Sequence, residues 1–178
     1  MLITFDCPAC ASRLELDAEE AGTRVVCPAC AAEVRAPLPR VAPGTTLGNF
    51  RLEEKIGSGG MGEVFLALQL SMDRRVALKV LPQALTRKPG VVERFNHEVR
   101  MSARLEHPHI VTAFEAGEDA GHHFLAVSYV EGEDLRHRLK REGALGEKEA
   151  LTHTRQIADA LAYAWNAFRM LHRDVKPA

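Results

Sequence analysis

Four glycines and a lysine form the part of this sequence best suited to hold a phosphate group. Gly57, Gly59, Gly60 and Gly62 crowd one turn, and Lys79 follows on a nearby apolar stretch. Apolar residues alternate before and after the glycines, which predicts a β-hairpin whose turn has no Cβ atoms to keep a ligand away. Backbone N–H groups in such a turn can approach phosphate oxygens closely. The pattern indicates phosphate binding, although a glycine-rich turn by itself is often only a turn.

The stretch around Lys79 reads as a strand with two different faces. In Arg75–Leu81 the larger apolar side chains share one face, whereas Ala77 and Lys79 share the other. The small Ala77 leaves room for a flat base, and Lys79 can reach phosphates from the same side. A dinucleotide-binding fold would need a helix directly after the glycines. Glu63–Leu68 reads as a strand instead, so that alternative is excluded.

Two identical C-P-A-C knuckles hold all four cysteines of the chain: Cys7, Cys10, Cys27 and Cys30. Sixteen residues separate the knuckles, which is inside the spacing of four-cysteine zinc sites. Four thiolates about 2.3 Å from one ion complete a tetrahedron, so such a site is closed and structural. The few apolar residues around the knuckles cannot form a sufficient core, and metal would supply most of the stability.

Disulfides and redox chemistry are the alternatives for the cysteines. The N-terminus lacks the basic and apolar regions of a signal peptide, and a cytosolic setting argues against disulfides. A redox site would need one C-x-x-C in a βαβ context, not two in a ribbon. The sequence therefore favours zinc.

Taken together, the glycine and lysine patterns resemble the protein kinases, whose signatures include G-x-G-x-x-G-x-V and V-A-I-K. Here they read I-G-S-G-G-M-G-E-V over Ile56–Val64 and V-A-L-K ending at Lys79. A third motif, H-R-D-V-K-P, contains Asp174 and Lys176 and is similar to the catalytic loop of the family. The lysine two residues after the aspartate is typical of serine/threonine kinases. The stretch before residue 37 resembles small bacterial zinc-ribbon fingers.

The resemblance implies a role for each charged residue. Lys79 would hold the α- and β-phosphates, aligned by Glu98 in a helix predicted over Val91–Arg104. On position alone Glu98 would be read as a solvated helix carboxylate. Asp174 would orient the attacking hydroxyl, and Lys176 would steady the γ-phosphate.

The resemblance also implies an ATP site on the glycine turn, the lysine strand and the hinge after a strand over Phe124–Val130. The implied ATP-binding residues are Ile56, Gly57, Ser58, Gly59, Gly60, Met61, Gly62, Val64, Ala77, Lys79, Val127, Ser128, Tyr129 and Val130.

The expected fold class is α+β, with four parts along the chain. The small lobe is expected as an antiparallel sheet plus one helix, followed by the first helices of the large lobe. The prolines of the linker predict an extended spacer, which would let the ribbon move independently. The expected parts are a zinc ribbon over 1–36, a Pro/Gly linker over 37–49, the small lobe and hinge over 50–130, and the start of the large lobe over 131–178.

Helices are predicted over Leu135–Glu142 and Glu147–Met170. Trp165 and Phe168 lie on the apolar stripe of the second helix and are interpreted as core residues. His107 and His109 are interpreted as turn and packing residues, and His122 and His123 as solvated hairpin residues and not as a metal-binding pair.

Composition limits the possible functions. At 178 residues and 46% hydrophobic content, the chain could bury one core plus a small module. A net charge of −1 gives no electrostatic footprint for nucleic acid. No apolar run approaches the roughly 20 residues needed to cross a bilayer, so a cytoplasmic location is expected.

The expected function is ATP-dependent phosphoryl transfer to serine or threonine hydroxyls, with ATP, Mg²⁺ and Zn²⁺ as cofactors. The sequence stops before the asparagine of H-R-D-x-K-P-x-N and contains no Asp-Phe-Gly, so magnesium ligands are absent from it. Weak nucleotide binding without phosphate transfer is therefore expected.

Two other functions stay open: a non-catalytic nucleotide- or partner-binding fragment, or a ribbon that binds a protein or nucleic acid. The sequence identifies no protein substrate and no regulatory partner. An uncovered apolar stripe on the long helix also predicts oligomers or aggregation.

Overall fold

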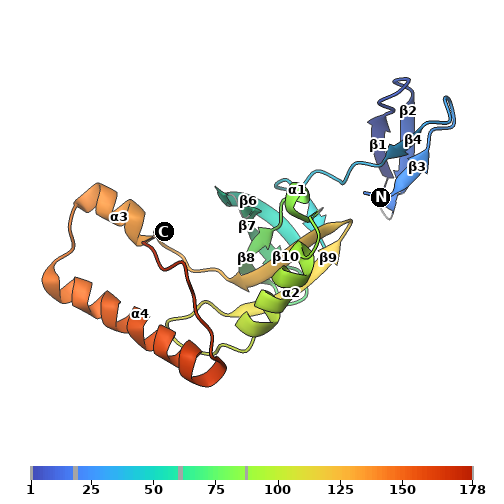
Figure 1. Ribbon diagram of the computed structural model, residues 1–178. Coiled ribbons are helices and arrows are strands. Elements are labelled where there is room, and N and C mark those ends of the chain that lie inside the picture. The colour runs from blue at the N-terminus through green and yellow to red at the C-terminus, as the bar shows by residue number, and fades with distance from the viewer. Residues whose placement is uncertain (1, 18–19, 60–61, 87, 178) are drawn as a thin grey trace.

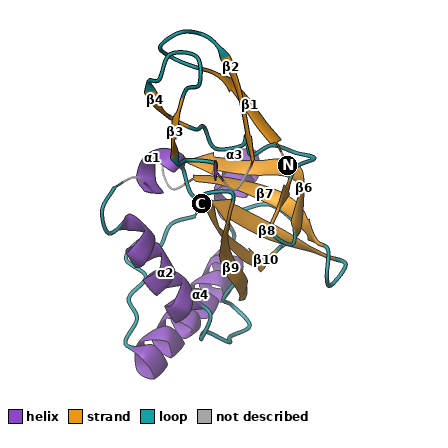
Figure 2. Cartoon of the chain, turned by 90° about the vertical axis from the view of Figure 1, so that its right-hand side faces the viewer, coloured by secondary structure: helices purple, strands orange, loops and turns teal. Residues whose placement is uncertain are grey.

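The computed structural model describes residues 2–17, 20–59, 62–86 and 88–177, apart from the side chains of Gln83, Ala84 and Glu98. It consists of two small hairpins, a six-stranded sheet and four helices, the first of which has only 4 residues (Figure 1). The hairpins lie beyond one end of the sheet, on the side away from the longest helix, in both views (Figure 1, Figure 2).

Along the chain, two helices lie between the eighth and ninth strands, and two more helices follow the last strand. The elements are β1 (Leu2–Asp6), β2 (Arg13–Asp17), β3 (Arg24–Val26), β4 (Glu33–Arg35), β5 (Thr46–Leu47), β6 (Phe50–Gly59), β7 (Gly62–Gln69), β8 (Arg74–Val80), α1 (Gln83–Thr86), α2 (Val91–Ser102), β9 (Ala113–Asp119), β10 (His122–Ser128), α3 (Leu135–Glu142) and α4 (Glu147–Phe168).

The N-terminal unit is built from two hairpins of the same design. β1 pairs with β2 and β3 pairs with β4, each pair forming a separate antiparallel sheet. Its buried cluster is very small and consists of Cys7, Leu14, Cys27 and Val34, with three partly buried neighbours. Two of these four residues are cysteines, so apolar packing is a minor part of what holds the unit together.

The main sheet is antiparallel with strand order β5-β6-β7-β8-β10-β9. Strand residues alternate between its two faces, because successive side chains of a strand point in opposite directions. In β8, Val76, Leu78 and Val80 are buried, whereas Ala77 and Lys79 are only partly buried, as the sequence predicts. We call the side of the sheet that contains Val76, Leu78 and Val80 the core face, and the side that contains Ala77 and Lys79 the lysine face. The core-face cluster contains Leu47, Phe50, Leu52, Phe65, Ala67, Val76, Leu78, Val80, Phe124 and Ala126.

β6 departs from the simple alternation that its sequence suggests. Its pairing with β7 shifts register between Leu52 and Glu54, and again between Lys55 and Gly57. Such bulges insert an extra residue and turn the following side chain. Ile56 therefore does not continue the buried row of Phe50 and Leu52, and its side chain is 42% exposed.

The sheet begins inside the range that the sequence predicts to be a linker. β5 pairs with β6 through Thr46 and Leu47, and Leu47 is buried in the core-face cluster. Val41, farther upstream, also packs against this cluster. The segment before β6 is thus a part of the fold, although its prolines and glycines are typical of a free spacer.

α2 lies next to β9 and buries Val99, and it ends two residues earlier than predicted. α4 likewise ends at Phe168, not Met170, because Arg169 adopts a left-handed conformation with φ 55° that stops the helix.

The buried face of α4 differs from the predicted stripe. The residues that α4 buries are Ala160 and Ala164, and Tyr163 beside them stacks on His107 with ring centroids 5.2 Å apart. His107 is thus a packing residue, as predicted. Trp165 is 42% exposed, so its prediction as a core residue is wrong. The helix uses its small residues to approach the segment before β9, and this turns Trp165 outward. Within the described part of the chain, no helix is long and apolar enough to span a membrane.

Candidate functional site

The lysine face carries the residues that the sequence assigns to the nucleotide. Strand pairing places Lys79 opposite Val64 on one side and Leu125 on the other. It places Ala77 opposite Leu66 and Val127. Paired residues of neighbouring strands point to the same face of a sheet. Three adjacent strands therefore bring one small residue, one cation and several apolar side chains to a single surface.

The glycine turn joins β6 to β7, and the structure explains the presence of glycine differently at Gly62 and at Gly59. Gly62 has φ 121°, and a Cβ atom there would lie 2.1 Å from the carbonyl oxygen of Val80. Glycine is thus required at this position for β7 to pack against β8. At Gly59, by contrast, no described atom lies within 4 Å of a Cβ position. The described residues therefore leave space beside the backbone of Gly59 that a ligand could enter. Gly60 and Met61 lie outside the described residues.

The hinge segment follows β10 directly. The backbone N–H of Ser128 donates to the Thr112 carbonyl at 2.8 Å, and the Ser128 hydroxyl accepts from the Thr112 N–H at 3.2 Å. Val127 is the last residue of β10 on the lysine face, whereas Tyr129 and Val130 lie beyond the strand. The strand therefore ends two residues earlier than predicted, and this leaves the backbone of Tyr129 and Val130 outside the sheet ladder.

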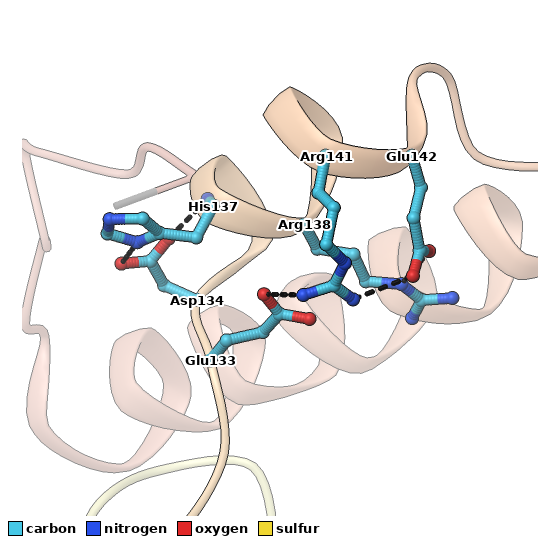
Figure 3. Close-up of polar contacts among 6 residues, drawn as sticks. All are labelled: Glu133, Asp134, His137, Arg138, Arg141 and Glu142. Atoms are coloured by element: carbon cyan, nitrogen blue, oxygen red, sulfur yellow. Dashed lines mark hydrogen bonds and ion pairs between the residues drawn. The ribbon is translucent and has the colours of Figure 1, made fainter.

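α3 begins directly after the hinge and is fixed by a polar cluster (Figure 3). The Asp134 carboxylate accepts a hydrogen bond of 2.8 Å from the backbone N–H of His137, which caps the helix. This bond, followed by the contact with the His137 side chain, lowers the pKa of Asp134. Arg141 contacts Glu133 and Glu142, at 2.5 and 2.6 Å. These contacts fix the direction in which the chain leaves the hinge.

One ion pair of the same cluster reaches from α3 to α4. Arg138 contacts Glu142 at 3.0 Å on its own helix and Glu149 on α4 at 2.6 Å. Exposed ion pairs of this kind stabilise by only about 0–1 kcal/mol each, so the cluster sets direction more than stability.

The catalytic-loop residues lie on the extended segment after α4, which runs back towards α3 (Figure 1). Lys176 Nζ contacts the Asp174 carboxylate at 2.7 Å, and the backbone N–H of Asp174 donates to the His172 ring at 3.3 Å. The hydrogen bond and the charge of Lys176 lower the pKa of Asp174. The structure thus brings Asp174 and Lys176 together, as an ionised pair.

Two cavities show how these parts are separated. Asp174 and Lys176 line one of about 470 Å³ together with apolar residues of α4, and no described residue of the glycine turn lines it. A second cavity, of about 800 Å³, borders the glycine turn at Ser58 and Gly59. Its other lining residues include Phe65 and Val80, so it lies on the core face, opposite to Lys79. Glu98 is on α2, and its side chain lies outside the described residues.

The four cysteines converge as their spacing predicts. Their sulfur atoms all lie within 4.8 Å of one another, with 3.8 Å between Cys7 and Cys30 and 3.7 Å between Cys10 and Cys27. Sulfurs about 2.3 Å from a central ion would lie about 3.8 Å apart at the corners of a tetrahedron. The cluster therefore has the size of a tetrahedral thiolate site that could hold a metal ion.

The two knuckles achieve this geometry by identical backbone turns. The N–H of Cys7 donates to the Ser12 carbonyl, and the N–H of Cys27 donates to the Ala32 carbonyl, at 2.8 and 2.9 Å. Ala11 and Ala31 occupy the same left-handed position of each turn, with φ 58° and 57°. Each knuckle presents one buried and one exposed cysteine.

The ionisation of the sulfurs is coupled. Hydrogen bonding to Ser12 lowers the pKa of Cys10 to about 6. The backbone N–H of Ala32 favours the Cys30 thiolate, but hydrogen bonding among the sulfurs and burial raise the pKa of Cys30 to about 12. Four thiolates this close repel one another unless a cation lies among them. All four are free, and the distances across the hairpins exceed the roughly 2.05 Å of a disulfide bond.

His122 is a residue whose place the sequence interpretation missed. Its side chain is buried, and its Nε2 lies 2.8 Å from the carbonyl oxygen of Pro39, so the prediction that it is solvated is wrong. The signal was present, because His122, Phe124 and Ala126 alternate along β10 and all are buried on the core face. His123 is also largely covered and lies 3.6 Å from Glu118.

Comparison with known proteins agrees with the resemblance. Residues 50–178 match the model of the protein kinase domain. The chain is 41% identical over 130 residues to serine/threonine-protein kinase pkn2 of Myxococcus xanthus, covering 73% of this chain and 15% of that protein. It is 35% identical to PrkC of Bacillus subtilis over 73% of this chain and 20% of the relative.

A solved structure agrees in fold as well as in sequence. The kinase domain of PknI from Mycobacterium tuberculosis superposes with a TM-score of 0.68 and 36% identity, over 78% of this chain and 56% of that domain. The chain thus spans about half of the solved domain and a smaller share of the curated relatives. The expected α+β fold, with the sheet and α2 as a kinase small lobe, is confirmed. The chain belongs to the protein kinase family, and the relatives named here are bacterial serine/threonine kinases.

Proposed function

We propose that this chain supplies the nucleotide-binding part of a kinase that transfers phosphate from ATP to serine or threonine hydroxyls of proteins. The observation that carries the proposal is the lysine face. There Ala77 and Lys79 share a partly buried surface with Val64 and Val127, and the backbone is open at Gly59. A surface with apolar side chains and one cation suits a flat base joined to phosphates.

Each group has a distinct task in this proposal. The adenine packs between the apolar residues of β7 and β10, with the hinge backbone of Ser128–Val130 as its polar partner. The N–H groups of the glycine turn approach the phosphates, and Lys79, oriented by Glu98, neutralises the α- and β-oxygens. Ile56, at the second bulge of β6, and the other ATP-binding residues implied by the resemblance to protein kinases complete the proposed site.

Asp174 and Lys176 are proposed to act on the acceptor side of the reaction. The lowered pKa of Asp174 keeps its carboxylate ionised, so it can accept a hydrogen bond from the substrate hydroxyl and orient that oxygen. Lys176 already neutralises part of this charge and can turn to the transferred phosphate. Magnesium, when bound, neutralises charge between the β- and γ-phosphates. The proposal assigns no residue of this sequence as a magnesium ligand.

A second proposal concerns the N-terminal unit over 1–36. We infer that Cys7, Cys10, Cys27 and Cys30 bind one zinc ion, because their spacing matches a tetrahedral site and the unit has almost no other core. The site has four protein ligands, which leaves no open position for catalysis. Its task is therefore structural, and a cytoplasmic location would keep the thiols reduced.

Nucleotide affinity tests the first proposal, with a matched pair of lysine variants. Lys79→Ala should weaken ATP or ADP binding roughly tenfold or more in calorimetry, because it removes a charged hydrogen-bond donor. Lys55→Ala is the control, since Lys55 pairs with Phe65 on the core face of the same sheet. Asp174→Ala should also leave nucleotide affinity unchanged. Equal losses in Lys79→Ala and Lys55→Ala would contradict the proposed site.

A further inference from the structure

The segment that connects the zinc-ribbon unit to the kinase sheet makes contacts along its whole length. We call residues 36–45 the strap. In Figure 1 it is the blue segment that leaves β4 and runs to the sheet. Its sequence predicts a free spacer, yet it bonds to the ribbon at one end and to the core face at the other.

The first contacts of the strap are with the ribbon. The N–H of Ala36 donates to the Thr23 carbonyl at 2.9 Å, and the N–H of Gly22 donates to the Ala36 carbonyl at 3.1 Å. Arg35 adds a side-chain bond of 2.7 Å to the Gly22 carbonyl. Ala36 is 1% exposed. The strap therefore starts as a continuation of the β3–β4 hairpin.

Leu38 is the residue that touches both bodies. A Cβ atom at Gly22, in the ribbon, would lie 3.0 Å from Leu38 Cδ2. A Cβ atom at Gly121, in the turn between β9 and β10, would lie 2.5 Å from the same atom. Both glycines have φ 75°, so each is a turn residue against which the leucine packs closely. One side chain thus connects the ribbon to the β9–β10 turn.

The next contacts fix the strap on the sheet. The Pro39 carbonyl lies 2.8 Å from Nε2 of the buried His122, and Val41 packs on the core-face cluster. Farther on, the N–H of Gly44 donates to the Leu52 carbonyl at 2.8 Å, and the N–H of Leu52 donates to the Thr45 carbonyl at 2.9 Å.

The strap also forms a wall beside the glycine turn. Arg40, Val41, Ala42 and Pro43 line the cavity of about 800 Å³ that Ser58 and Gly59 border from the other side. A strap that leaves the sheet would open this cavity on the side of the ribbon. The position of the strap therefore determines the shape of the cavity that borders the glycine turn on the core face.

From these contacts we propose that the outer, core-face side of the small lobe is a docking surface for the chain's own strap, and that metal loading of the ribbon is coupled to this docking. The coupling rests on the proposed zinc site. Metal fixes Cys27 and the β3–β4 hairpin, the hairpin holds Gly22 and Ala36, and these hold Leu38 against Gly121. Loss of the metal releases Leu38 and with it the strap.

Hydrogen exchange of the whole chain, measured with zinc bound and after chelation, tests the coupling. Local opening speeds the exchange of the amides involved. Chelation should speed exchange roughly tenfold or more in peptides that cover residues 43–52 and 117–123, because the bonds of Leu52 to Gly44 and Thr45 of the strap open and the β9–β10 turn is no longer covered by Leu38. Peptides from α4 should not change, since α4 makes none of these contacts.

Two leucine variants separate the docking from the metal. Leu38→Ala should keep one zinc per chain but exchange at 43–52 and 117–123 at the rate of the chelated protein, and chelation should add nothing further. Leu2→Ala is the control, because Leu2 is 59% exposed on β1 of the same unit. It should behave as the wild type.

The possible outcomes distinguish the two proposals. If the chain binds zinc and chelation changes only peptides within 2–35, the coupling is wrong while the metal site stands. If Leu38→Ala and Leu2→Ala exchange alike, the docking itself is wrong. If the chain binds no zinc, the metal site fails and the coupling with it, whereas a difference between the two variants would still support the docked strap.

Discussion

Gly62→Ala should destabilise the small lobe far more than the same change at Gly59, although both glycines belong to one motif. At Gly62 the new Cβ atom would lie 2.1 Å from the carbonyl oxygen of Val80, and φ is 121°. Backbone is the group that would have to move, because the clash is not with the end of a flexible side chain. At Gly59 no described atom lies within 4 Å.

The magnitude follows from two costs. A side chain in a sparsely populated backbone region costs about 1–3 kcal/mol. Forcing β7 and β8 apart to admit the methyl group costs about 1–3 kcal/mol more. The sum of roughly 2–6 kcal/mol is a large part of the stability of a domain of this size. Gly59→Ala should cost almost nothing, but the methyl group would occupy space proposed for phosphate.

Urea unfolding followed by circular dichroism measures the difference. With a slope of about 2 kcal/mol per molar urea, the midpoint of Gly62→Ala should fall by roughly 1–3 M. Gly59→Ala should unfold as the wild type does and bind ATP more weakly. Equal midpoints for the two variants would refute the assignment of Gly62 to packing and Gly59 to the ligand.

Three further predictions concern the metal site of the ribbon, the N-terminus of α3 and the surface of α4. Native mass spectrometry should detect one zinc per chain, lost in Cys27→Ser together with the ribbon structure; four freely reacting thiols in the purified wild type would contradict this. The pKa of Asp134 is lowered below its usual value of 3.8, so its capping bond stabilises α3 fully above that pH and is lost as the pH falls through the lowered value. Asp134→Asn should remove this acid transition from the circular dichroism signal of the helix, and an unchanged transition would contradict the assignment. The exposed Ile157 and Trp165 should drive self-association, which sedimentation of Trp165→Gln should reduce; a monodisperse wild-type monomer would show that this expectation is wrong.

Predictions from the sequence succeeded where one local rule determines the structure. β8 is an example, since alternation alone separates Ala77 and Lys79 from the buried side of the strand. The cysteine knuckles are another, because two C-x-x-C turns at this spacing converge on one point whatever surrounds them. In both cases the residue types and their spacing are enough to determine which side chains lie together.

Predictions failed where a distant partner decides. The bulges in β6 leave no sign in its composition, so the alternation of apolar residues does not reveal that Ile56 leaves the buried row of Phe50 and Leu52. The strap reads as a spacer because its prolines and glycines describe only local stiffness, and its contact with His122 lies 83 positions away in sequence. On α4 the apolar stripe is wider than the surface it meets. Which side is buried depends on the segment it packs against, and that side contains Ala160.

The edges of the six-stranded sheet have a consequence for how copies of this chain can meet. An open edge strand offers unpaired N–H and C=O groups to another chain and invites aggregation. β9 forms one edge, and it carries the carboxylates of Glu115, Glu118 and Asp119 while α2 lies beside it. Two such edges brought together would oppose like charges, so stacking of sheets into fibres through β9 is disfavoured. Extension of the sheet through β9 is therefore not the expected route by which copies of this chain associate.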